Sequence, residues 1–142
     1  MKVLQYVAVD DCGTQVNPMI VEGQVHGGVI QGLAQALFEV AEYDTDGNLR
    51  NASLAEYLVP AASDVPSLTL GHTITPSPTN QLGVKGIDET RTISAAPTMI
   101  NAIVDALSGL GVDDVLMPAS PQTVWATIQA AIPKTPSNGD SK

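Results

Sequence analysis

Hydrophobic and polar positions follow two periods along the chain, one typical of strands and one typical of helices. Residues 3–9, VLQYVAV, and residues 67–75, SLTLGHTIT, have the apolar, β-branched pattern of strands. Apolar residues recur at helical spacing over residues 18–40, and again in the segments that follow Pro97 and Pro121. The pattern predicts an α+β domain with a small mixed sheet and three main helices.

Local signals predict where these helices begin and end. Asn17 is a typical N-cap and Pro18 fits a first helical turn, so the first helix is expected to begin there. Pro97 is expected to begin the second helix, with Gly109 just beyond its end. Ser120 is the expected cap of the third helix.

The segment EVAEYDTDGNLRN, residues 39–51, carries an Asp-Gly turn signal and predicts a hairpin. Its acidic and amide residues also alternate as in a calcium-binding loop: Asp44, Asp46 and Asn48. The twelfth loop position would be Ala55 instead of glutamate, and no flanking helices are expected. The sequence therefore disfavours calcium binding here.

The first predicted helix contains an unusual number of glycines: Gly23, Gly27, Gly28 and Gly32. Each glycine costs roughly 1 kcal/mol relative to alanine inside a helix. Either another part of the protein packs closely against the backbone, or part of the segment is a loop. Gln24 and Gln31 lie two turns apart and suit hydrogen bonding to a polar heterocycle or a phosphate-bearing cofactor, but they also suit the rim of a packed helix pair.

Composition and charge exclude several classes of protein. The net charge of −9 and the lack of a basic patch argue against nucleic-acid binding. Cys12, the one cysteine, leaves no internal disulfide and no self-contained iron–sulfur cluster, and the two histidines make a zinc site improbable. A membrane span is not expected. A cytoplasmic location is expected, with export on a partner's signal as the alternative. The domain is expected over residues 1–132, incomplete on its own, with a disordered tail at 133–142.

Residues 82–97, LGVKGIDETRTISAAP, gather four charges in an otherwise apolar stretch: Lys85, Asp88, Glu89 and Arg91. Burial would raise the pKa of a carboxyl here toward that of a useful general base. The same residues could also form an ordinary surface loop before a helix, where acids are favourable near the helix N-terminus. Composition alone does not choose between these two interpretations.

Four segments together resemble the C-terminal part of the large, molybdenum-binding subunit of the molybdenum hydroxylases, the family of xanthine dehydrogenase, aldehyde oxidoreductase and carbon monoxide dehydrogenase. They are DDCGTQVNPMIVEGQVHGGVIQGLAQALFE, EYLVPAASDVP, TPSPTNQLGVKGIDET and ISAAPTMINAIVDAL. They occur in family order and span roughly residues 7–130. The combination is specific, although each piece alone would be weak.

The resemblance implies a role for each matched residue. Glu89 matches the glutamate beside molybdenum that acts as a general base, while oxygen derived from water is added to an aldehyde or an aza-heterocycle. Gln31 matches a glutamine that contacts the pterin. The segment Lys85-Gly86-Ile87-Asp88 matches the approach to the same cofactor. No protein side chain of this chain is expected to bind the metal, because the pterin sulfurs do so.

The resemblance also implies cofactors and partners. The expected cofactor is molybdenum–molybdopterin, with the cytosine dinucleotide as one form of the pterin. Electrons would leave to [2Fe-2S] clusters and FAD on partner chains. The expected partners are the remainder of the molybdenum subunit, an iron–sulfur subunit and a flavin subunit, so the isolated chain is expected to be inactive.

Two positions depart from the family pattern. The family usually has glycine in place of Asp88 and of Arg91. A side chain at the first position could crowd the metal, and one at the second would be strained if its backbone angle were positive. These departures favour an alternative function, that of a non-catalytic scaffold or degenerate fragment with the same fold.

Overall fold

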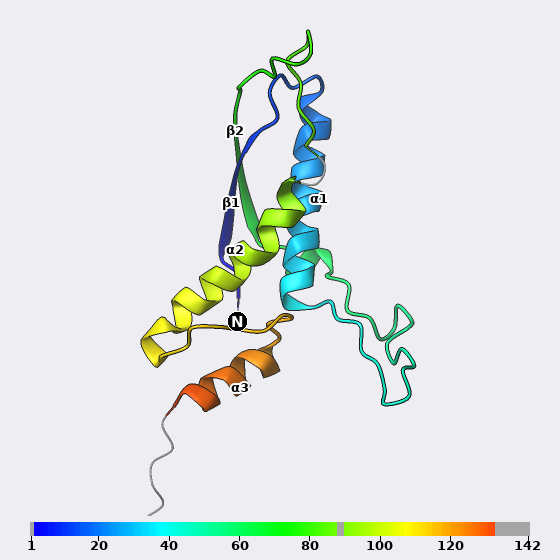
Figure 1. Ribbon diagram of the computed structural model, residues 1–142, viewed down its shortest axis with the longest axis vertical. Helices are drawn as coiled ribbons and strands as arrows, with labels where there is room; N and C mark the ends of the chain where they lie inside the picture. The colour runs from blue at the N-terminus through cyan, green and yellow to red at the C-terminus, as the bar shows by residue number, and fades with distance from the viewer. Residues whose placement is uncertain (1, 88–89, 133–142) are drawn as a thin grey trace, which may run out of the picture.

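The computed structural model describes residues 2–87 and 90–132 of the chain, and its fold is the expected α+β one, with a small sheet and three helices (Figure 1). The strands are β1 (Gln5–Asp11) and β2 (Ser67–Thr73), and the helices are α1 (Pro18–Leu37), α2 (Thr90–Leu107) and α3 (Pro121–Ala131). Short 3-10 turns occupy Ala62–Asp64 and Ser108–Leu110.

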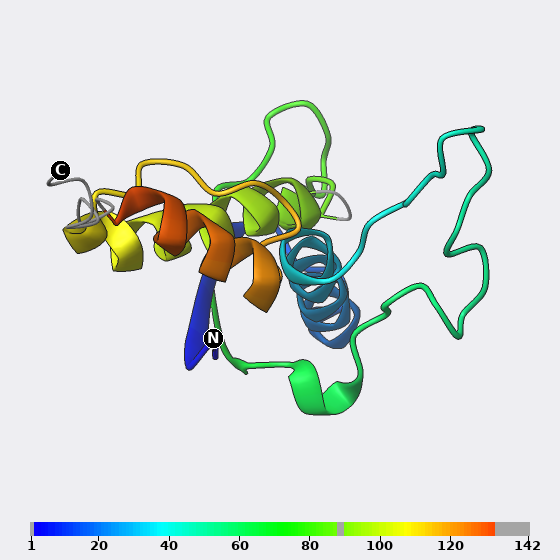
Figure 2. The same ribbon diagram turned by 90° about the horizontal axis from the view of Figure 1, so that it is seen from below.

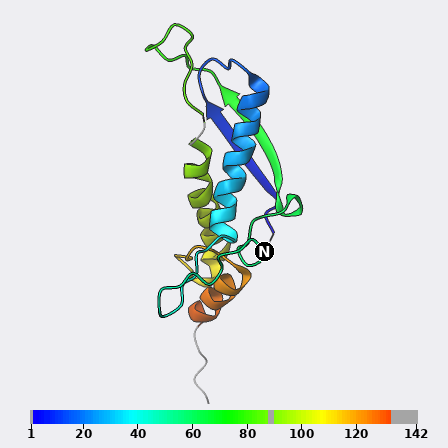
Figure 3. The ribbon, with the colours of Figure 1, turned by 90° about the vertical axis from the view of Figure 1, so that its right-hand side faces the viewer.

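The two strands pair in parallel, from Gln5 opposite Ser67 to Asp11 opposite Thr73. They run side by side along α1, which lies between them in the sequence (Figure 3). Beyond the end of β1, an isolated antiparallel bridge joins Gly13 to Val84. The two described strands therefore form a parallel sheet, and the antiparallel bridge lies outside them.

The helix starts follow the predicted capping chemistry. The side chain of Asn17 accepts a hydrogen bond from the amide of Ile20 at 3.3 Å, at the start of α1. Ser120 accepts one from the amide of Thr123 at 3.1 Å, at the start of α3. The third helix lies beside the C-terminal half of α2 (Figure 2), and Val124 packs there against the core.

The expected start of α2 at Pro97 is wrong, because the helix begins at Thr90 and contains this proline. A proline inside a helix removes one backbone hydrogen bond and costs about 3 kcal/mol. One face of the turns before it is buried, with Arg91, Ala95 and Ala96 facing the interior. Burial of this face outweighs the local preference for a helix end.

The predicted hairpin forms its turn but not its strands. Gly47 has a φ of +84°, and the amide of Asp44 donates to the carbonyl of Asn48 at 2.9 Å. One isolated bridge, between Tyr43 and Leu49, replaces a ladder. The turn belongs to a long connection, residues 38–66, that projects from the helices (Figure 1).

The segment Thr90–Leu110 is long and apolar enough to cross a membrane, by length and composition alone. Its most apolar window has a mean hydropathy of 1.3 and is 22% buried. One such helix is weak evidence for a span, because packed helices of other proteins share these properties. Here the first turns of the helix pack against α1, where Gly28 and Gly32 face Arg91 and Ala95.

The glycines of α1 divide into two faces. A Cβ at Gly32 would lie 2.5 Å from the Cβ of Ala95, and one at Gly28 would lie 2.7 Å from the Cβ of Arg91. A Cβ at Gly23 or Gly27 would meet nothing within 4 Å. Close packing therefore explains the first two glycines, and the other two leave an open backbone face on α1.

This division predicts opposite effects of two alanine substitutions on stability. Gly32→Ala should reduce the free energy of unfolding by about 1–3 kcal/mol, because the added methyl group overpacks the contact with α2. Gly27→Ala should increase it by up to about 1 kcal/mol, because alanine favours the helix and no neighbour obstructs the methyl group. Urea unfolding followed by circular dichroism measures both, and equal effects would contradict the packing.

Candidate functional site

The loop that leads to Lys85, Gly86 and Ile87 is fastened to the end of β1. The amide of Lys85 donates to the carbonyl of Cys12 at 2.9 Å, and the amide of Thr14 donates to the carbonyl of Gly83 at 3.1 Å. These backbone bonds flank the bridge between residues 13 and 84. The segment before the two adjacent carboxylates therefore has a fixed attachment.

Two glycines make this close approach possible. Gly13 has a φ of +65°, and a Cβ there would lie 2.2 Å from the carbonyl oxygen of Gly83. Gly83 has a φ of +67°, and its Cβ would lie 2.8 Å from the Cβ of Pro76. A side chain at either position would separate the loop from the strand.

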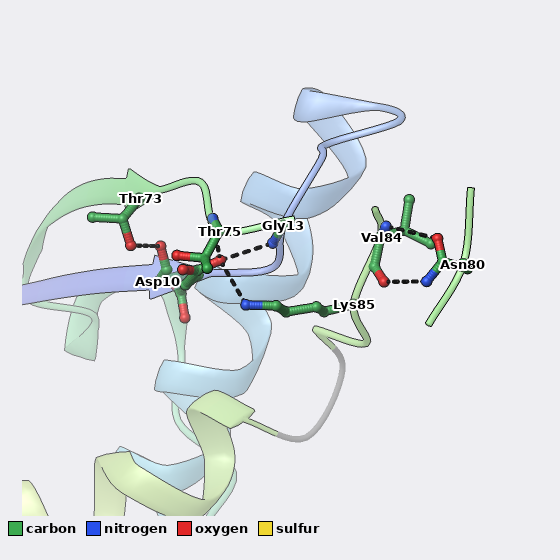
Figure 4. Close-up of polar contacts among 8 residues, drawn as sticks. Asp10, Gly13, Thr73, Thr75, Asn80, Val84 and Lys85 are labelled. Carbon is green, nitrogen blue, oxygen red and sulfur yellow. Dashed lines mark hydrogen bonds and ion pairs between the residues drawn. The ribbon is translucent and has the colours of Figure 1, made fainter. Parts of the chain in front are cut away.

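Asn80 closes the loop on itself. Its side-chain oxygen accepts from the amide of Val84 at 3.1 Å, and its side-chain nitrogen donates to the carbonyl of the same residue at 2.9 Å (Figure 4). The pair of bonds holds the residue immediately before Lys85.

The side chain of Lys85 points to the end of β1 and forms an ion pair with Asp11, with Nζ and Oδ1 3.2 Å apart (Figure 4). The same oxygen accepts from the amides of Gly13 at 2.9 Å and Thr75 at 3.0 Å. Hydrogen bonds from Thr75, foremost from its side chain, and from the amide of Gly13 hold the pKa of the Asp11 carboxyl well below its ordinary value, and Lys85 adds to the effect. This carboxylate therefore stays ionised and structural, and it is no candidate for a general base.

Behind the loop, Asp10 and Arg91 form an ion pair whose side chains are 4% and 9% exposed. Burial lowers the pKa of the Arg91 guanidinium, and the neighbouring Tyr6 opposes this effect. None of the described non-glycine residues has a positive φ, so Arg91 is not strained as its replacement of a family glycine had suggested. It begins the buried face of α2, against Gly28.

The other predicted site residues are only partly brought together. Gly86 is exposed, and a Cβ there would meet nothing within 4 Å. Ile87 packs against the core. Gln31 is exposed on α1, and its Oε1 accepts from the hydroxyl of Thr92, at 3.5 Å, in the first turn of α2. Asp88 and Glu89 lie outside the described residues.

Several other candidates have structural roles. His26 is hydrogen-bonded through Nδ1 to the carbonyl of Glu22 at 3.0 Å, and Cys12 is buried. Asp44 accepts from the amides of Asp46 at 2.9 Å and Asn48 at 2.8 Å. These bonds stabilise a turn, so the alternating acids have a structural role. Residues 2–87 and 90–132 contain no cluster of three or more potential metal-ligating His, Cys, Asp or Glu side chains.

Sequence reasoning missed the part played by the end of β1. Asp10 and Asp11 are adjacent, so they face opposite sides of the strand and bind Arg91 and Lys85 respectively. Two acids at the end of an apolar strand, in a chain with only six basic residues, were the available signal.

Comparison with known proteins places these features in a family. A model described as molybdopterin cofactor-binding domain matches residues 1–66. The carbon monoxide dehydrogenase large chain of Hydrogenophaga pseudoflava is 41% identical, over 90% of this chain and 16% of its own length. The nicotine 6-hydroxylase large subunit of Paenarthrobacter nicotinovorans is 43% identical, over 87% of this chain and 15% of its own.

Solved structures agree with these relatives. A Cu,Mo-CO dehydrogenase matches with a TM-score of 0.88 and 36% identity, over 92% of this chain and 16% of that one. Quinoline 2-oxidoreductase from Pseudomonas putida 86 matches with a TM-score of 0.84 and 41% identity, over 90% of this chain and 16% of that one. The chain belongs to the molybdenum hydroxylase large-subunit family.

The described residues of this molybdenum hydroxylase sequence fit a bulky polar cofactor chemically. The backbone is open at Gly27 and Gly86, where an added Cβ would meet no neighbour. Gln31 offers an exposed amide, and Lys85 offers an exposed cation that is paired with Asp11 in this structure. Open glycine backbone, an amide and a cation are the groups that bind a phosphate-bearing heterocycle.

The buried pair of this molybdenum hydroxylase chain gives a second prediction on stability. Removing one partner, in Arg91→Met or Asp10→Asn, should cost about 3–5 kcal/mol, because it leaves a buried polar group without its partner. The double variant should recover part of that loss. A double-mutant cycle on urea unfolding measures the coupling, and additive losses would contradict the pair.

Proposed function

We propose that this chain is part of the catalytic molybdenum subunit of a hydroxylase or dehydrogenase, with Glu89 as its general base. The observation that supports this most is the attachment on both sides of Asp88 and Glu89. Before them, Lys85 is held by the carbonyl of Cys12 and by Asp11. After them, Arg91 is held by Asp10.

Three consecutive residues, the last two of β1 and Cys12 just beyond it, thus anchor both flanks of the proposed base. A catalytic group works best when the elements on either side of it are fixed. The entropy lost in orienting the group is then part of the free energy of folding and does not add to the barrier of each reaction cycle. The anchoring acids are themselves neutralised by Lys85 and Arg91, so they need not compete with Glu89 for a proton.

The proposed cofactor is molybdenum–molybdopterin, held in part by Gln31 and by Lys85, Gly86, Ile87 and Asp88. When bound, it supplies the two-electron redox chemistry that the protein lacks. Within this chain, the amide of Gln31 would orient the pterin by hydrogen bonds, and the open backbone at Gly86 would allow its close approach. Glu89 would take a proton from the water that supplies the product oxygen.

The proposed substrate is an aldehyde or an aza-heterocycle. The cytosine dinucleotide form of the pterin, [2Fe-2S] clusters and FAD on partner chains, and a cytoplasmic location are further parts of this proposal. The partners would be the rest of the molybdenum subunit, an iron–sulfur subunit and a flavin subunit. The relatives are much longer than this chain, since the match covers 16% of the carbon monoxide dehydrogenase large chain. This difference in length supports the rest of the molybdenum subunit as a partner.

A non-catalytic scaffold is the alternative, and one observation favours it. The buried pair with Asp10 gives Arg91 a structural role at a position where the resemblance expects glycine. The substitution Arg91→Gly would restore the family pattern but would leave the buried Asp10 without its ion-pair partner. The variant that tests crowding of the metal is therefore Asp88→Gly alone.

The assembled complex should lose about 10²–10⁴-fold in kcat when Glu89 is changed to Gln, because the amide cannot accept the proton. Turnover is measured with an aldehyde, a pyridine-type heterocycle and carbon monoxide, using an artificial electron acceptor. Molybdenum content is measured in the same samples.

Glu42→Gln is the matched control, since it makes the same chemical change at an exposed position of the connection between α1 and β2. It should leave turnover unchanged. Full activity of a molybdenum-loaded Glu89→Gln complex would refute the proposed base. A wild-type complex that is inactive, and becomes active only with Asp88→Gly, would establish the scaffold.

A further inference from the structure

The two-stranded sheet has one covered face and one bare face. Along β1, burial alternates strictly, with Tyr6, Ala8 and Asp10 turned toward the helices. Val7 and Val9 point the other way and are 61% and 59% exposed. The helices thus cover only half of the apolar surface of this strand.

A parallel sheet rarely has one face exposed to solvent. Parallel strands occur almost only where both faces are covered, and a two-stranded sheet is marginal by itself. Opposite Val9, β2 has Gly71, whose missing side chain leaves space on the bare face. An apolar side chain from outside can fill that space beside the valine.

Polar groups border this bare face. On the β2 side, Thr69 lies opposite Val7, and its hydroxyl accepts from the side chain of Gln5 at 3.1 Å. The ion pair of Lys85 with Asp11 lies at the end of β1. An apolar centre with a polar rim is the usual composition of a protein interface. The bare face therefore has the character of a docking surface.

The apolar surface of the chain is spread over several elements, which identifies the kind of partner. Exposed apolar side chains also occur around the start of α1 and near α3: Val16, Met19, Ile20, Leu116, Met117 and Trp125. A symmetric contact with a second copy covers one self-complementary patch. A longer polypeptide that surrounds the chain covers all of them, and the similar solved chains are long enough, since this chain matches 16% of each.

We infer that the outer face of the sheet, centred on Val7 and Val9, is the docking surface for an apolar segment of the rest of the molybdenum subunit. The inference rests on the proposed function for its partner. The new element is the surface itself, which should be closed to solvent only in the assembly.

Thiol labelling tests the surface without adding a charge. In the isolated chain, Val9→Cys should react readily with a maleimide. In the assembly purified from its own source, the same thiol should react at least about tenfold more slowly, because access limits thiol reactivity. Thr45→Cys, on the exposed polar turn, is the matched control and should react alike in both. The native Cys12 is buried and gives the background rate.

A second variant measures the energy of docking. Val9→Asp should leave the circular dichroism of the isolated chain unchanged, since the side chain is exposed there. It should weaken binding to the rest of the subunit by about tenfold or more, because an unpaired charge would be buried.

The possible failures are distinct. Equal labelling of Val9→Cys in the chain and in the assembly would overturn this surface and leave the proposed function standing. Labelling that slows with the concentration of the isolated chain alone would assign the face to a second copy and overturn the inference. A native preparation without any molybdenum-subunit polypeptide would overturn the proposed function itself.

Discussion

The close contact between α1 and α2 is the constraint on which the other features depend. Gly28 and Gly32 let the backbone of α1 approach Arg91 and Ala95 at a distance that any side chain would prevent. This approach keeps α2 helical through Pro97, and it sets the first turn of α2 at the end of β1. Without it, the buried arginine would not reach Asp10.

From that contact follows the arrangement of the candidate site. Residues 10–12 carry three different attachments, an inward carboxylate, an outward carboxylate and a backbone carbonyl, and each holds a residue on one side of Asp88 and Glu89. The strand end is thus a fixed support and the proposed chemistry lies beside it. The same three positions support both the fold and the proposed site, so variants there are expected to affect stability and, if the proposal holds, activity.

The sequence was informative where local chemistry decides the structure. The cap at Asn17 and the strand pattern of residues 3–9 predicted their elements, because both depend on neighbours in the chain. The start of α2 was predicted wrongly, since tertiary packing outweighs the preference of Pro97 for a helix start. The pair of Asp10 with Arg91 was out of reach, because it joins distant segments through a glycine contact. Glu89 came from the family resemblance and stays a prediction.

The most direct measurement is the native mass and metal content of the chain, recovered by an affinity tag from its own source. If the chain is part of a molybdenum subunit, it should be recovered with stoichiometric molybdenum and the rest of that subunit, with iron on a partner chain. A lone, metal-free chain would contradict this prediction, and the charged residues of segment 82–97 would then have no catalytic function.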